Sequence, residues 1–99
     1  MLVDDNLSVR AGKFTVINKQ GLHVRPATVI AEVAIKYPTA DLMIGKNGHF
    51  VDAKAPLNIL TIADVDGTEY ELRAGGPDAH KVIEEVIGLS LVKFNVSDD

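Results

Sequence analysis

One histidine of this sequence stands among residues that suit it for phosphoryl chemistry. His23 lies within the run Gly21-Leu22-His23-Val24-Arg25-Pro26-Ala27. A neutral imidazole has a nitrogen lone pair that can attack phosphorus, and a nearby guanidinium carries a permanent planar charge that matches phosphoryl oxygens. We therefore expect His23 to be the phosphoryl acceptor and Arg25 to be the charge partner of the bound phosphoryl group.

The residues around His23 predict that it lies where a strand has ended and a helix begins. Gly21 loosens the turn, and Pro26 is tolerated because first-turn amides lack intrahelical partners. The free amides of Val24 and Arg25, together with the helix dipole, would favour a bound phosphate and disfavour a charged imidazolium. For an isolated His-x-Arg triplet a helix cap or a surface residue would be the better interpretation, and the flanking glycine and proline reverse that preference.

The same run resembles the active-site motif of HPr, the histidine phosphocarrier of the bacterial sugar phosphotransferase system. The resemblance extends from about Phe14 to Gly88 and implies the family's α+β open-faced sandwich. It also implies that His23 accepts a phosphoryl group on Nδ1 from the phosphoenolpyruvate-dependent Enzyme I and passes it to Enzyme IIA domains. Such a carrier works in the cytoplasm during sugar uptake, with no cofactor and no independent turnover.

Two departures from the sugar-branch pattern leave alternatives open. Many family members carry a regulatory serine in a Lys-Ser pair, whereas this chain has Lys54 followed by Ala55, so we expect control by the family's serine kinase to be absent. The segments 18–21 and 76–77 resemble NPr, the paralogue of the nitrogen-related branch. A regulatory phosphocarrier of that branch, or a module that works by docking on another protein, is therefore the alternative function.

A docking surface beside His23 is expected from residues on the first helix and on a short second one. By resemblance to the family, Leu57 and Leu60 lie near the active histidine, and helical phase turns them outward while Ile59 and Ile62 face the core. The expected docking residues are Ala27, Leu57, Leu60 and Thr61. The alternative for the two leucines is an ordinary place in the core.

The remaining elements follow from hydrophobic periodicity and turn residues. Residues 14–18 predict a strand, and the apolar spacing from Pro26 predicts a helix that ends at Tyr37-Pro38. Asn47-Gly48 between two apolar runs predicts a hairpin. Residues 55–63 fit a short helix or a buried strand, and we favour the helix. Polar and apolar residues alternate over 69–73, which predicts a strand. A last helix is expected to begin near Pro77 and to end at Gly88. The order βαββαβα predicts a four-stranded antiparallel sheet with three helices on one face.

Composition sets the remaining expectations. Ninety-nine residues with 46% hydrophobic content suit one domain, which we place at 13–88 between a flexible arm (1–12) and a tail (89–99) that docks on the domain or on a second copy. A net charge of -4 argues against nucleic-acid binding, including that of an RNA-binding sandwich. Cysteine is absent and no apolar run reaches the ~20 residues of a membrane span, so we expect a cytoplasmic protein without membrane insertion. His49 and His80 lack partners at metal-ligand spacing, so we expect no metal site. We expect the protein to be a monomer.

Overall fold

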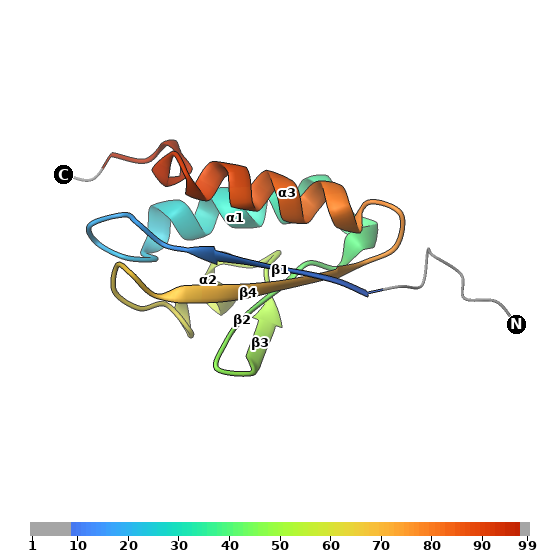
Figure 1. The fold of residues 1–99 in the computed structure, drawn as a ribbon, viewed down its shortest axis with the longest axis horizontal. Coiled ribbons are helices and arrows are strands. Elements are labelled where there is room, and N and C mark those ends of the chain that lie inside the picture. The colour runs from blue at the N-terminus through green and yellow to red at the C-terminus, as the bar shows by residue number, and fades with distance from the viewer. Residues whose placement is uncertain (1–8, 98–99) are drawn as a thin grey trace, which may run out of the picture.

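The computed structural model describes residues 9–97 of the chain. The helices and strands follow in the order β1 (Val9–Thr15), α1 (Val24–Lys36), β2 (Met43–Lys46), β3 (His49–Asp52), α2 (Pro56–Leu60), β4 (Glu69–Gly75) and α3 (Ala79–Ser90). The strands form one antiparallel sheet in the order β1-β4-β2-β3, and α1 and α3 lie side by side over it (Figure 1). The predicted α+β fold and its order of elements are confirmed.

The core lies between the sheet and the helices, and alternation along β4 shows how the sequence builds it. Tyr70, Leu72 and Ala74 are buried, whereas Glu69 before them and Arg73 between the last two are exposed. The α1 helix contributes residues at helical spacing. Its buried side chains are Pro26, Ala27, Ile30, Ala31, Val33 and Ala34. Each large aliphatic side chain buried in this way contributes about 1.5–3 kcal/mol.

The predicted hairpin joins β2 and β3. Asn47 and Gly48 have φ angles of 54° and 83°, so both central residues adopt the left-handed conformation that two-residue hairpin turns require. The flanking residues Lys46 and His49 are paired across the two strands. The Asn-Gly pair therefore sets the register of this part of the sheet.

The structure corrects the position of the first strand. We expected it at residues 14–18, but β1 runs from Val9 to Thr15, so it begins inside the stretch 1–12 that was expected to be an arm. Its pairing with β4 decides these bounds, because Val9 lies opposite Gly75 and Thr15 lies opposite Glu69. Residues 1–8 of the expected arm lie outside the described residues.

The structure also corrects the end of the last helix. Gly88 does not end α3, which continues to Ser90 and then turns into a short 3-10 segment at Lys93–Asn95. Phe94 in this segment is 1% exposed and packs edge-on against Phe14, with ring centroids 5.7 Å apart. The described part of the tail therefore docks on its own domain, and the burial of Phe94 outweighs the weak helix propensity of Gly88.

Candidate functional site

His23 is the N-cap residue of α1. Its backbone is extended (φ -94°, ψ -169°), and its carbonyl accepts the Ala27 amide over 3.0 Å. The side chain makes no capping hydrogen bond to the first turn of α1, where the amides of an α-helix lack intrahelical partners. The ring is half-buried, and its Nε2 atom is buried without a hydrogen-bond partner within residues 9–97. These features place one imidazole edge inside the fold at the positive end of a helix.

The turn before His23 rests directly on a second loop. Gly21 has φ 71°, and a Cβ atom added there would lie 2.2 Å from the Asp64 carbonyl oxygen. The same oxygen accepts the Leu22 amide over 3.0 Å, and the Leu22 side chain is buried. Glycine is therefore required at position 21 by both its φ angle and the close approach of the loops. This contact sets the direction in which the chain enters α1.

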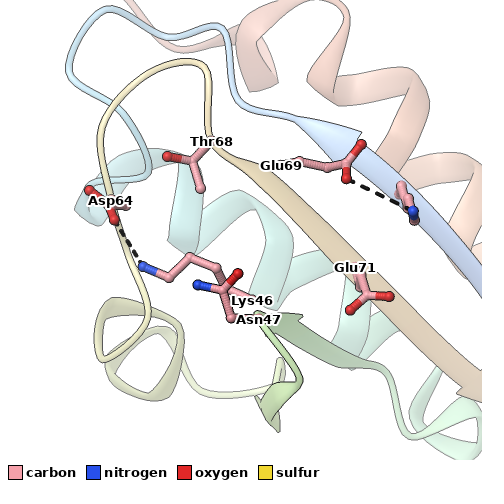
Figure 2. Close-up of a pocket in the computed structure, with 7 residues that line it drawn as sticks. Lys46, Asn47, Asp64, Thr68, Glu69 and Glu71 are labelled. Atoms are coloured by element: carbon pink, nitrogen blue, oxygen red, sulfur yellow. Dashed lines mark hydrogen bonds and ion pairs between the residues drawn. The ribbon is translucent and has the colours of Figure 1, made fainter.

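Asp64 is itself held by an ion pair with the hairpin. Its carboxylate accepts the Lys46 ammonium over 2.9 Å and the Val65 amide over 2.8 Å, and these two hydrogen bonds lower the pKa of Asp64 below its ordinary value. Figure 2 shows this pair at one end of a polar hollow of about 480 Å³, with Glu69 paired to Lys13 farther along the sheet. The lysines of the hollow are paired with its carboxylates, and Lys46 supports the loop under His23.

A shallower hollow of about 350 Å³ opens beside His23. Its other lining residues are Gln20, Leu22, Val24, Leu60, Ala63, Asp64 and Val65. Val24 and Val65 are 57% and 65% exposed, so the rim of the hollow is apolar and open to solvent. Val24 was expected at the site only through its backbone amide, and neither valine side chain was expected on the docking surface. A valine between two aspartates in a turn, such as Val65, is an unusual place for a core residue.

The expected docking residues do not all lie on this surface. Leu57 is 77% exposed on α2, Thr61 is exposed at its end, and Leu60 is half-buried in the hollow. Ile59 and Ile62 face the core, as helical phase predicted. Ala27 is completely buried on the inner face of α1, so its side chain offers no surface to a partner. The exposed apolar surface therefore comes from α2, Val24 and Val65.

Arg25 lies on the exposed side of α1, where its guanidinium contacts the C-terminal segment. Its Nη2 atom donates to the Ser97 carbonyl over 3.1 Å. The buried Asn18 side chain donates from its Nδ2 atom to the Lys93 carbonyl over 3.0 Å and so joins the same segment to the loop before α1. The C-terminal segment therefore reaches the site that contains His23, which the sequence analysis did not predict.

The start of α2 lacks a hydroxyl side chain. Ala55 is the N-cap residue and makes no side-chain capping bond. Instead, Asp52 accepts the Lys54 amide over 2.8 Å, and this hydrogen bond is the main reason that the pKa of Asp52 lies below its ordinary value. The Lys54 ammonium pairs with Asp52 and Asp41. This end of α2 therefore has no side chain that a serine kinase could modify at position 55.

The other two histidines do not line the hollow beside His23. His49 begins β3, and His80 pairs with Glu84 on the exposed side of α3 over 3.3 Å. Within residues 9–97, no group of three or more histidine, aspartate or glutamate side chains is arranged to hold a metal ion. Over the same residues, no helix has the length and apolar character to cross a bilayer.

Comparison with known proteins places these observations in a family. The family described as the PTS HPr component phosphorylation site matches residues 11–90. The chain belongs to the HPr family. It is 36% identical over 76 residues to the phosphocarrier protein HPr of Mycoplasma capricolum, which covers 75% of this chain and 84% of that protein.

Membership of the HPr family is also evident in three dimensions. The crystal structure of HPr-C-His from Thermoanaerobacter tengcongensis superposes with a TM-score of 0.81 at 27% identity and covers 89% of this chain and 98% of that one. The chain is also 31% identical over 87 residues to the multiphosphoryl transfer protein of Haemophilus influenzae, but it spans only 17% of that protein's length. The matched family region includes His23, Arg25 and Ala55.

Proposed function

We propose that this chain accepts a phosphoryl group on His23 from Enzyme I and passes it to Enzyme IIA domains in sugar uptake. In the accepting step, a bond forms between His23 Nδ1 and phosphorus, and the donor's bond to phosphorus breaks with its electron pair. The ring loses one proton, and the leaving group takes up one proton, so charge and atoms balance. The carrier needs no metal or cofactor for this step, because phosphoryl transfer depends mainly on positioning and charge stabilisation.

The observation that carries the proposal is the placement of the imidazole at the start of α1. Nε2 is buried, which leaves Nδ1 as the ring nitrogen that a phosphoryl donor can approach. A phosphoryl group there would meet the first-turn amides of Val24 and Arg25, which are hydrogen-bond donors at the positive end of the helix dipole. The guanidinium of Arg25 is close enough in sequence to add a charge-assisted hydrogen bond.

The apolar rim beside His23 suits brief contact with successive partners. Val24 and Val65 expose apolar side chains in the hollow beside His23, and Leu57 exposes another on α2. Exposed apolar patches mark interaction sites. A carrier must bind both donor and acceptor and then release them, so a small interface is an advantage. We place the protein in the cytoplasm as a monomer that docks on Enzyme I and Enzyme IIA through this rim.

Labelling from phosphoenolpyruvate tests the proposal directly. With Enzyme I present, the chain should take up one acid-labile phosphoryl group, and His23→Ala should abolish the uptake. His49→Ala and His80→Ala are the matched controls, since both histidines are exposed and lie outside the site. Labelling that survives His23→Ala would refute the assignment.

A regulatory phosphocarrier of the nitrogen-related branch is the second candidate, because Ala55 removes the usual site of serine control. Labelling the chain with Enzyme I from each branch in parallel distinguishes the two, since the cognate enzyme should act faster. A module that works without phosphate would instead bind its partner equally well before and after labelling. Incubation with the serine kinase and ATP should leave either carrier unmodified at position 55.

A further inference from the structure

The Lys46–Asp64 ion pair connects the two hollows of the surface described above. Asp64 lines both the polar hollow of Figure 2 and the hollow beside His23. Its carboxylate accepts the Lys46 ammonium over 2.9 Å. The Lys46 side chain is only 24% exposed, so salt in the solvent screens this pair less than a fully exposed one.

The backbone keeps the Asp64 carboxylate near the reactive histidine. The Asp64 carbonyl accepts the amide of Leu22, the residue before His23, over 3.0 Å. Bond lengths then hold the carboxylate on the order of 10 Å from the His23 backbone. Among the described residues that line the hollow beside His23, Asp64 is the only one with an ionisable side chain apart from the histidine itself. The net charge at Asp64 therefore acts on any anion bound in this hollow.

An unpaired carboxylate at this place would oppose phosphorylation. A phosphoryl group on His23 carries about two negative charges, and a carboxylate about 10 Å away repels it. The Lys46 ammonium cancels the charge of that carboxylate. The support of the turn before His23 does not need the Asp64 side chain, because the Leu22 amide donates to a main-chain carbonyl. The charge of the ion pair can therefore be tested separately from the support of the loop.

We propose that Lys46 neutralises Asp64 and thereby keeps the hollow beside His23 able to receive a dianionic phosphoryl group. This inference rests on the proposed function. Lys46 acts through Asp64, and the pairing lowers the free energy of the phosphorylated form relative to the unphosphorylated one. A lysine of the β2–β3 hairpin thus sets how much of the carrier is phosphorylated at equilibrium.

Two single variants of the full chain should shift this equilibrium in opposite directions. Lys46→Met keeps the apolar stem but leaves the carboxylate unpaired, so the ratio of phosphorylated to unphosphorylated chain should fall about threefold. Asp64→Asn keeps an oxygen that can accept the Val65 amide but leaves the ammonium, so the ratio should rise about twofold. The ratio is measured with Enzyme I, phosphoenolpyruvate and pyruvate at ~10 mM salt.

A purely structural role of the ion pair predicts a different pattern. If the pair only held the loop, both single variants would lower the ratio, and the double variant would stay as low as the lower of the two. Neutralisation predicts instead that Lys46→Met combined with Asp64→Asn returns the ratio to within about 1.5-fold of the parent, because neither position is then charged. The effect of Lys46→Met should also shrink below about twofold at ~150 mM salt.

Lys13→Met is the matched control. Lys13 pairs with Glu69 in the same polar hollow but is not among the described residues that line the hollow beside His23. This variant should keep the ratio within about 1.5-fold of the parent. Circular dichroism checks that each variant is folded.

A fall of the ratio in both single variants, or no fall in Lys46→Met at low salt, would overturn the inference while the proposed function stands. A parent chain that takes up no phosphoryl group on His23 from Enzyme I would refute the proposed function, and the inference with it.

Discussion

Gly21→Ala is expected to disturb the fold and the site together. Alanine at φ 71° costs about 1–2 kcal/mol, because its Cβ approaches the neighbouring backbone in the left-handed region. The added Cβ would also lie 2.2 Å from the Asp64 carbonyl oxygen, so the two loops must separate. That separation breaks the hydrogen bond from the Leu22 amide, which contributes about 0.5–1.5 kcal/mol. The expected loss in the free energy of unfolding is therefore about 1.5–3.5 kcal/mol.

Gly48→Ala provides the matched control. Gly48 has φ 83°, but a Cβ added there has no atom within 4 Å, so this variant should lose only the conformational term of about 1–2 kcal/mol. Thermal unfolding followed by circular dichroism should show the difference, because 1 kcal/mol shifts the midpoint of a domain of this size by about 4–8 °C. The rate of phosphoryl uptake should fall for Gly21→Ala and stay at the parent value for Gly48→Ala.

The result that would refute this reasoning is a Gly21→Ala variant no less stable than Gly48→Ala. It would mean that the loops can move apart without cost, so that the Asp64 carbonyl does not set the position of the chain before His23. A variant that is destabilised as expected but is phosphorylated at the parent rate would show instead that α1 alone positions the histidine.

Three further outcomes follow from particular contacts. Phe94→Ala should lower the free energy of unfolding in urea by about 3–5 kcal/mol, because it empties a buried site; a loss below about 1 kcal/mol would mean that the C-terminal segment adds little to the core. The pKa of Glu85 lies below its ordinary 4.5, mainly because its carboxylate accepts a hydrogen bond from Lys36. The ionised carboxylate therefore stabilises the folded protein above about pH 4.5, and this contribution is lost as the pH falls through the folded-state pKa of Glu85. Glu85→Gln should therefore lose up to about 1 kcal/mol at neutral pH and match the parent in strongly acidic solution, whereas a pH-independent loss would contradict the ion pair. Leu57→Glu should fold normally, since the side chain is 77% exposed, yet slow transfer from Enzyme I; unchanged transfer would remove Leu57 from the docking surface.

Local patterns predicted much of this protein correctly. The spacing of apolar residues gave α1 its buried face, and Asn47-Gly48 predicted the turn between β2 and β3. Both signals depend on residues close together in the chain, as does the placement of His23 at the start of a helix. The bounds of β1 were not predictable in the same way, because the residues 9–13 become a strand by pairing with β4, about sixty positions farther along.

The sequence by itself determined that His23 stands at the start of a helix, and it determined the order of helices and strands. Only the tertiary structure decided that Gly21 rests on the Asp64 carbonyl and that Arg25 donates to Ser97, 72 positions away. Turn chemistry and hydrophobic period act over a few residues, so they can be read along the chain. Contacts between distant segments depend on how the whole core packs, and no local pattern records which backbone carbonyl will lie opposite a given side chain.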